Sequence, residues 1–459
     1  MKSAWAIVAM LTVIAAQQGT ANAVAREPGA PRKPPNIVVI LTDDQGLADY
    51  SAYGTSDIRT PNIDRVFREG QTWKNFYANS CVCSPTRAAL LSGLYPDRAG
   101  VPGVIRDIPA DSWGRLAPHV KLLPELLKPA GYHSTIVGKW HLGYAAPDTP
   151  LDRGFGSFHG FLGDMMDDYR SHLRHGRNFM RRDRDEIRPE GHATDLFSDW
   201  ACATLRERAK AGSPFFLYLA YNAPHDPIQP PEEWLARVRE RQPQLSPKRA
   251  GLVALIEHLD AGIGRVLGTL DELGLARDTI VVFTSDNGGL LTYEANNGPW
   301  RSGKTHMYEG GLRVPMAVRW PAKVAAGSTA TRIGASMDLC PTLLAAAGLQ
   351  PPPGLDGVNL LATLQGDDSA GPERELYFVR REGGMAYNGK TIEALRRGDW
   401  KLVLDSPYAP AELYHLGRDP SETTNLAAKE PMVLADLSAA LRRHIQRGGE
   451  VPWQAARSE

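Results

Sequence analysis

The sequence has little cysteine and no excess of charge of either sign. Its 459 residues include 52 lysines and arginines against 52 aspartates and glutamates, without a long basic run. A nucleic-acid partner is therefore not expected, because such proteins carry a basic balance or a basic patch. The four cysteines, Cys81, Cys83, Cys202 and Cys340, are too few for a disulfide scaffold in a chain of this length. Only Cys81 and Cys83 lie close together, and their spacing is not that of a zinc knuckle.

Apolar runs long enough to span a membrane are also missing, so no stable membrane anchor is expected. The N-terminal apolar run at residues 4–16 follows Lys2 and precedes Ala21-Asn22-Ala23. This arrangement is typical of a Sec-type signal peptide at residues 1–23, cleaved after Ala23. It predicts a periplasmic or secreted protein, in which disulfides are permitted but not required.

The rest of the chain alternates apolar runs with amphipathic segments. Continuous β-branched and aromatic runs, typical of strands buried on both faces, occupy residues 36–41, 133–138, 215–220 and 279–284, with a further strand expected at 314–320. Apolar residues at helical spacing predict helices at residues 63–69, 122–130 and 252–273. The alternation predicts an α/β fold with a large, mainly parallel central sheet flanked by helices.

The composition shifts at the proline- and glycine-rich segment 349–357. We expect a linker at residues 24–35, a large domain at 36–350 and a smaller C-terminal α+β subdomain at 351–459. In the subdomain, short alternating strands are expected at 375–381 and 394–404, in a small antiparallel sheet, with a closing helix at 431–447.

The segment Cys83-Ser84-Pro85-Thr86-Arg87 precedes an apolar run with helical spacing. Ser84 is a candidate N-cap, and Pro85 fits the first turn of the helix. Cys83 would then face free N–H groups and the positive end of the helix dipole, with Arg87 one turn away. This geometry leaves two alternatives open: a buried structural cysteine, or a reactive cysteine beside an anion site.

Polar residues follow four of the predicted strands. They are Asp43 and Asp44, Lys139 and His141, His225, and Asp286 and Asn287. Because ligands bind at the carboxyl ends of parallel strands, these side chains are candidates for one site. Carboxylate and amide oxygens suit Ca²⁺ or Mg²⁺ and not zinc. A dication together with Arg87, Lys139 and Lys304 would suit an anionic group transferred through a charged transition state.

The motif Cys83-x-Pro85-x-Arg87 followed by AALLSG resembles the signature of the type I, formylglycine-dependent sulfatases of the alkaline phosphatase superfamily. The second signature of that family, GYHSTIVGKWHLG, is present as well. TDDQG, NAPHDP, SDNGG and GKTHMYEGGLRVP are also present, in the family's order along the chain, and the resemblance extends from residue 36 to about residue 425. The runs DDYRSH and IRTPNID are similar to those of arylsulfatase-B-like enzymes and N-acetylgalactosamine sulfatases.

The resemblance implies a sulfuric ester hydrolase whose catalytic domain is the 36–350 segment. A formylglycine-generating maturation enzyme would oxidise Cys83 to Cα-formylglycine, and the hydrated aldehyde would be the nucleophile. Its implied ligands for Ca²⁺, in preference to Mg²⁺, are Asp43, Asp44, Asp286, Asn287 and the modified Cys83. Arg87, Lys139 and His141 would orient the hydrate, while His225 and Lys304 would hold the sulfate ester and assist the leaving group.

The same comparison suggests a mechanism. A sugar alkoxide is a poor leaving group, so the site must activate a nucleophile, neutralise the sulfuryl oxygens and protonate the leaving oxygen. We expect Asp286 to deprotonate the nucleophile, His225 to donate to the leaving oxygen and His141 to accept the proton that frees sulfate.

The implied substrate is a sulfated carbohydrate, a glycosaminoglycan or another sulfated polysaccharide fragment. The charge-rich segment 164–190 is either a solvated insertion or one wall of the sugar pocket. Two other functions stay open: a formylglycine-dependent phosphonate or phosphodiester hydrolase, and a non-catalytic homologue that binds sulfated glycans.

Overall fold

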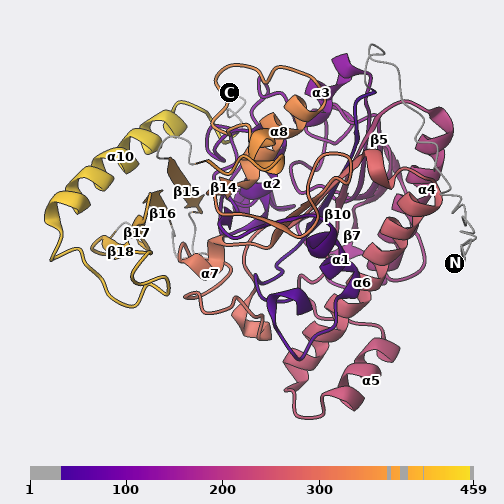
Figure 1. The fold of residues 1–459 in the computed structure, drawn as a ribbon, viewed down its shortest axis with the longest axis horizontal. Coiled ribbons are helices and arrows are strands. Elements are labelled where there is room, and N and C mark those ends of the chain that lie inside the picture. The colour runs from indigo at the N-terminus through magenta and orange to yellow at the C-terminus, as the bar shows by residue number, and fades with distance from the viewer. Residues whose placement is uncertain (1–32, 370–373, 383–390, 407, 455–459) are drawn as a thin grey trace, which may run out of the picture. The chain divides into compact units, whose positions relative to one another are not determined.

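The computed structural model describes residues 33–369, 374–382, 391–406 and 408–454. The expected signal peptide at 1–23 and residues 24–32 of the expected linker lie outside the described residues. Within the described part, ten strands form one mixed sheet in the order β13-β2-β12-β11-β1-β10-β4-β5-β8-β9 (Figure 1). Their bounds are β1 Asn36–Thr42, β2 Gln71–Trp73, β4 His133–Lys139, β5 Ser157–Phe161, β8 Met180–Arg182, β9 Asp185–Glu186, β10 Phe215–Ala220, β11 Thr279–Ser285, β12 Met316–Arg319 and β13 Ser328–Ala330.

The middle of this sheet is parallel. β1 lies between β10 and β11, β4 pairs with β10 and β5 pairs with β4, all in the parallel sense. Every residue of β1, β10 and β11 is buried, which explains their continuous apolar sequences. The predicted α/β class with a large, mainly parallel sheet is therefore confirmed. The strand expected at 314–320 is shorter, and β12 runs antiparallel to β11 because the chain returns from the carboxyl edge without a crossover.

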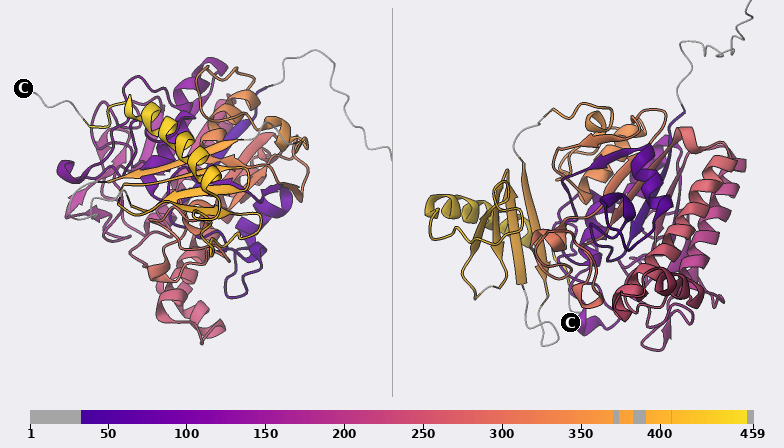
Figure 2. Two further views of the ribbon diagram at one scale, coloured as in Figure 1. Left: turned by 90° about the vertical axis from the view of Figure 1, so that its left-hand side faces the viewer. Right: turned by 60° about the horizontal axis from the view of Figure 1, so that its bottom comes forward.

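Helices cover both faces of the sheet (Figures 1 and 2). One layer holds α1 (Pro61–Glu69), α4 (Ala193–Ala211) and α6 (Pro247–Glu272), with α5 (Glu232–Arg241) packed on α6. The other holds α2 (Cys83–Ser92), α3 (Leu123–Leu127) and α8 (Leu339–Ala346). α6 begins earlier than the apolar spacing indicated, because Ser246 caps it by accepting from Arg249 N and Pro247 occupies its first turn.

Several elements were not anticipated from the sequence. α4 is capped by His192, whose side chain accepts from Thr194 N, and ends at Gly212 in the left-handed conformation. The short helices are α7 (Glu309–Leu312) and α9 (Leu361–Leu364). Two small sheets pair β3 (Phe76–Tyr77) with β14 (Gly334–Ala335), and β6 (Leu173–Arg174) with β7 (Arg177–Asn178). Single 3₁₀ turns occur at Ser51–Tyr53, Pro109–Asp111, Lys128–Ala130, Ala276–Asp278, Leu291–Tyr293 and Ser336–Asp338.

A second, antiparallel sheet follows toward the C-terminus. Its strands are β15 (Glu375–Arg381), β16 (Thr391–Arg397), β17 (Trp400–Leu404) and β18 (Glu412–His415). The single strand expected at 394–404 is wrong: Gly398, with a positive φ of 56°, turns the chain between β16 and β17. α10 (Pro431–Gly449) covers one face of this sheet, and the other face turns toward the large sheet (Figure 2). A subdomain boundary at residue 351 stays a prediction.

None of the helices in the described part of the chain is both long enough and apolar enough to cross a bilayer.

Candidate active site

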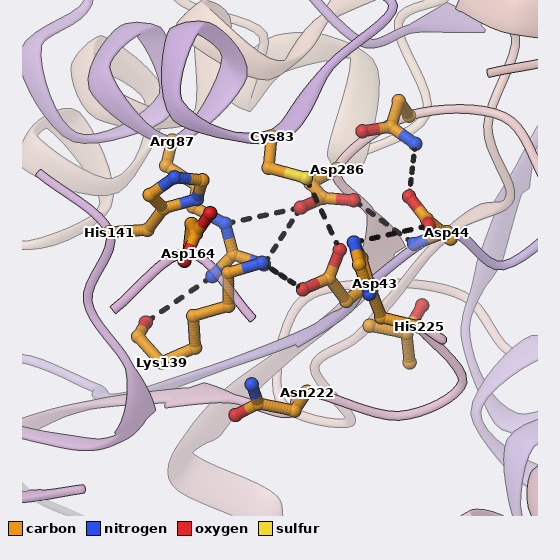
Figure 3. A network of polar contacts seen from close by, with 12 residues as sticks. Asp43, Asp44, Cys83, Arg87, Lys139, His141, Asp164, Asn222, His225 and Asp286 are labelled. Atoms are coloured by element: carbon orange, nitrogen blue, oxygen red, sulfur yellow. Dashed lines mark hydrogen bonds and ion pairs between the residues drawn. The ribbon is translucent and has the colours of Figure 1, made fainter. Parts of the chain in front are cut away.

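The polar side chains that follow four strands meet at one edge of the central sheet (Figure 3). They are Asp43 and Asp44 after β1, Lys139 and His141 at the end of β4, His225 after β10, and Asp286 and Asn287 after β11. These strands run parallel, so their carboxyl ends lie at the same edge. Cys83, Arg87 and Lys304 reach the same place from α2 and from the loop before α7.

Cys83 is the first residue of α2. Its sulfur lies 3.4 Å from Asp43 Oδ1, and the residue is 4% exposed. The expectation that Ser84 caps this helix is wrong, because Val82 holds the N-cap position and no side-chain hydrogen bond caps it. The Ser84 hydroxyl instead accepts a hydrogen bond from Ile105 N at 3.2 Å. A tertiary contact has therefore taken the hydroxyl that could have capped the helix.

The Cys83 thiol is not an activated nucleophile. Burial, and then the negative charge of Asp43, raise the pKa of the Cys83 thiol well above its usual range. Lys139 opposes this shift without reversing it. Of the two alternatives that the sequence left open, these surroundings favour the buried thiol over a reactive thiolate. All four cysteines are buried thiols.

Arg87 joins two carboxylates beside Cys83. Its Nε and Nη2 lie 3.1 and 2.7 Å from Asp286 Oδ2, and Nη2 lies 3.3 Å from Asp43 Oδ2. Lys139 Nζ contacts the other side of the Asp43 carboxylate. Burial, and then Asp43, raise the pKa of Asp286 to about 6. Burial would also raise the pKa of Asp43, but Lys139 and the neighbouring cations hold it below its usual range. Asp43 is thus a fixed negative charge, and Asp286 can exchange a proton near neutral pH.

Lys304 links Asp44 to His225. Its Nζ lies 2.6 Å from Asp44 Oδ2 and 2.9 Å from His225 Nε2. Burial would lower the pKa of Lys304, but Asp44 raises it above its usual range, so the ammonium stays charged. An ammonium can only donate, which makes His225 Nε2 the acceptor. His225 Nδ1, 2.7 Å from the main-chain oxygen of Asp226, then carries the imidazole proton.

His141 is oriented as a neutral proton acceptor. Its Nε2 donates to the main-chain oxygen of Ile105 at 2.9 Å, whereas its buried Nδ1 has no hydrogen-bond partner. Burial, and then Lys139 and Arg87, lower the pKa of His141 well below its usual value. The imidazole therefore carries its proton on Nε2 and presents the Nδ1 lone pair.

The donor set fits a hard dication. Asp43, Asp44, Cys83 and His225 each place one potential ligand atom within 4.8 Å of the others. Asn287 Nδ2 donates to Asp44 Oδ1 at 2.7 Å, and the buried Oδ1 of Asn287 has no hydrogen-bond partner. An unpartnered buried amide oxygen beside converging carboxylates is the environment that Ca²⁺ prefers. His225, which the sequence did not mark as a metal ligand, belongs to this close cluster.

Part of the charge-rich segment 164–190 lies beside the site. His141 N donates to the main-chain oxygen of Leu162 at 3.2 Å, two residues before Asp164, and both His141 and Asp164 are drawn in Figure 3. Arg174 on β6 holds this carboxylate, with Nε 3.0 Å from Asp164 Oδ1. The adjacent His175 has Nδ1 3.1 Å from Asp107 Oδ2, in the loop that also carries Ile105. These contacts place part of the segment close to the site, and its role as a wall of the sugar pocket stays a prediction. Neither Asp107 nor Asp164 carries a local sequence signal, because both lie in irregular loops.

Comparison with known proteins gives consistent matches over nearly the whole described chain. The family model named Sulfatase matches residues 35–349, and the model for the C-terminal region of N-sulphoglucosamine sulphohydrolase matches residues 300–448. The chain is 33% identical over 447 residues to N-acetylgalactosamine-6-sulfatase of Rattus norvegicus, covering 86% of this chain and 81% of that protein. It is 28% identical over 537 residues to N-acetylgalactosamine-6-O-sulfatase of Bacteroides thetaiotaomicron, covering 96% and 99%. The solved structure of Ps i-CgsB with k-i-k-neocarrahexaose matches with a TM-score of 0.83 and 28% identity, over 92% of this chain and 95% of that one.

Proposed function

The chain belongs to the sulfatase family, as a type I sulfatase of the alkaline phosphatase superfamily, and from this premise we propose that it removes sulfate from carbohydrates with a formylglycine hydrate and Ca²⁺. That it is a sulfuric ester hydrolase follows from the family. The observation that carries the rest is Cys83, a buried thiol with a raised pKa at the centre of converging carboxylates and cations. A thiol in that state is a poor reagent.

Conversion of Cys83 by a formylglycine-generating maturation enzyme would resolve this mismatch. The hydrated aldehyde would supply a nucleophilic hydroxyl, and Ca²⁺ held by the carboxylates would lower the pKa of that hydroxyl and stabilise negative charge on the sulfuryl oxygens. We assign the Ca²⁺ ligands to Asp43, Asp44, Asp286, Asn287 and the modified residue 83. Asp43, Asp44 and Cys83 belong to the close cluster, and Asp286 and Asn287 are linked to Asp44 by hydrogen bonds of 3.2 and 2.7 Å.

The chain's own side chains supply the remaining steps. Asp286, with its pKa of about 6, accepts the proton of the nucleophilic hydroxyl. Arg87, Lys139 and Lys304 neutralise the sulfuryl oxygens. Once substrate occupies the site, protonated His225 donates from Nε2 to the leaving oxygen, while the neighbouring Lys304 keeps its charge for the sulfuryl oxygens. The unpartnered Nδ1 of His141 accepts the proton whose loss frees sulfate.

The proposed substrate is a sulfated carbohydrate. Two of the related proteins are named as sulfatases of N-acetylgalactosamine 6-sulfate groups, and a related structure holds a carrageenan oligosaccharide. Asp164 and Asp107 are buried and paired with Arg174 and His175, so we assign them a role in shaping this side of the site and not in direct contact with sugar. N-acetylgalactosamine 6-sulfate and the galactose sulfates are therefore the first compounds to test.

The test is sulfate release from defined sulfated mono- and oligosaccharides by protein produced together with a formylglycine-generating enzyme. Mass spectrometry of the peptide containing residue 83 reports the conversion of thiol to aldehyde. Cys83→Ala should lower turnover by about 10³-fold or more while leaving the fold intact. Sulfate release at the wild-type rate by Cys83→Ala contradicts the proposal, and faster hydrolysis of phosphodiesters than of sulfate esters supports the phosphodiesterase alternative instead.

We further propose export through the signal peptide at residues 1–23, with a periplasmic or secreted mature protein. N-terminal sequencing of protein from the periplasm or medium should begin at Val24. Retention of Met1 in the cell fraction contradicts this proposal.

A further inference from the structure

The Tyr169 hydroxyl lies against the turn that carries His225. It is 2.9 Å from the main-chain oxygen of Asn222 and 2.9 Å from the main-chain oxygen of His225. The same turn is closed by His225 N, which donates to the Asn222 oxygen at 2.9 Å. One buried hydroxyl proton is therefore shared between the carbonyls at the two ends of one turn.

Tyr169 is itself held firmly in place. Its main-chain N–H donates to Gln229 Oε1 at 2.9 Å, and its main-chain oxygen accepts from Ala193 N at 2.9 Å. Its ring stacks on His192, with centroids 5.0 Å apart and an interplanar angle of 25°. The residue is 1% exposed. His192 and Ala193 stand at the start of α4, so these contacts hold the Tyr169 hydroxyl in a fixed position relative to that helix.

The turn that Tyr169 contacts sets the direction of the His225 ring. His225 reaches Lys304 at 2.9 Å from this turn, and Asn222 lies below it in Figure 3. The turn is also joined to β1 by Asp43 N, which donates to the Ala223 oxygen at a longer 3.2 Å. A change of about 1 Å in the ring position can cost up to about a hundredfold in rate. The hydroxyl contacts to the turn are thus placed where they control proton delivery.

We propose that Tyr169 is a positioning residue for His225, aligning its imidazole with the leaving oxygen through the 222–225 turn. The inference rests on the proposed role of His225. It also gives the DDYRSH run a structural role. Through Tyr169, this run contacts the main chain of the turn that carries His225.

The test compares Tyr169→Phe with Tyr132→Phe. Tyr132 makes the same kind of bond, with its hydroxyl 2.5 Å from the main-chain oxygen of Pro35, at the opposite end of the sheet. Both substitutions remove one hydroxyl and keep the ring. The measured quantities are kcat and KM for a series of substituted phenyl sulfates, from 4-nitrophenyl sulfate to unsubstituted phenyl sulfate, together with the thermal midpoint.

For Tyr169→Phe we expect kcat to fall about tenfold on phenyl sulfate and much less on 4-nitrophenyl sulfate, with KM nearly unchanged. A good leaving group needs little protonation. Misalignment of the proton donor should therefore make kcat fall more steeply as the leaving group becomes poorer. Tyr132→Phe should keep the wild-type dependence. Equal losses on both esters, or identical behaviour of the two variants, overturn the inference.

His225→Gln separates this inference from the proposed function. If His225→Gln steepens the leaving-group dependence and Tyr169→Phe does not, the inference about Tyr169 alone is wrong. If His225→Gln leaves the dependence unchanged, the proposed role of His225 is wrong and the inference falls with it.

Discussion

Lys401 of β17 and Glu309 at the start of α7 form an ion pair of 2.9 Å in which neither side chain is more than 1% exposed. Glu422 forms a second ion pair with the same ammonium at 2.8 Å, and its other oxygen accepts from the main-chain N–H of Glu309 at 2.7 Å. Burial would raise the pKa of Glu309, but Lys401 and nearby arginines hold it at about 2. The C-terminal sheet thereby holds α7, and α7 follows the loop that carries Lys304.

Lys401→Met should destabilise the protein by about 3–5 kcal/mol, because it leaves the buried Glu422 carboxylate without its cation and leaves Glu309 paired with Arg313. Urea unfolding followed by circular dichroism measures the change. Adding Glu422→Gln to Lys401→Met should recover part of the loss, since it removes the carboxylate that was left without a cation. An unchanged midpoint for Lys401→Met would show that this ion pair does not hold the two parts together.

Calcium should stabilise the protein independently of catalysis. A ligand that binds only the folded state adds about 3 kcal/mol at a hundredfold excess over its Kd. The thermal midpoint should therefore fall on treatment with a chelator and return with Ca²⁺ more than with Mg²⁺. Asn287→Ala removes the unpartnered amide oxygen and should weaken this response. A thermal midpoint that changes with neither chelator nor Ca²⁺ contradicts the assignment of the metal site.

The strands of the central sheet could be predicted because burial on both faces requires an apolar residue at nearly every position. β1 and β10 are continuous apolar runs, and β10 occupies the range expected for it. The sequence of α4 has no comparable apolar pattern. It carries charged residues along its length, and it is held by packing on α6 and by the unexpected cap His192.

The site divides in the same way. Residues at strand ends could be expected to meet, because parallel strands share a carboxyl edge. Contacts between loops could not. Ser84 is a good N-cap by composition, but Ile105 N takes its hydroxyl, and no local pattern relates Tyr169 to His225. These pairings depend on how loops cross in space, which neither periodicity nor spacing records.

Arg174→Ala tests whether the 164–190 segment forms a wall of the sugar pocket. Arg174 holds Asp164 at 3.0 Å and Asp167 at 3.0 Å, so its loss should loosen the β6–β7 hairpin. We expect KM for a sulfated sugar substrate to rise about tenfold, the value of one charge-assisted contact, while KM for 4-nitrophenyl sulfate stays constant. Arg188→Ala, on an exposed pair with Glu186 in the same segment, is the control. Equal KM changes for both esters would favour the solvated-insertion alternative.

Asp260 of α6 gives a pH dependence that can be separated from the active site. Its carboxylate accepts from Asn62 N at 3.0 Å and Ile63 N at 2.7 Å, at the start of α1, where Thr60 makes no capping bond. Burial raises the pKa of Asp260 to about 7, against these hydrogen bonds. The folded state therefore holds its proton more tightly than the unfolded chain, whose aspartate has a pKa near 3.8. The contribution of Asp260 to stability is greatest below that value and decreases as pH rises toward about 7.

Asp260→Asn removes the ionisation and keeps an oxygen that can accept from Ile63 N. Relative to the variant, the wild type should lose about 2–3 kcal/mol of unfolding free energy between pH 5 and pH 8, at about 1.4 kcal/mol per pKa unit. Urea unfolding of both proteins at the two pH values measures this difference. All other titratable groups are common to the two proteins, so their contributions cancel. Asp64→Asn removes a half-buried neighbouring carboxylate whose charge contributes to the raised pKa of Asp260, so it should make this pH trend smaller without abolishing it. If the difference in unfolding free energy between wild type and Asp260→Asn is the same at both pH values, the carboxylate is ionised in the folded state throughout. The N-terminus of α1 would then stabilise its charge more than burial destabilises it.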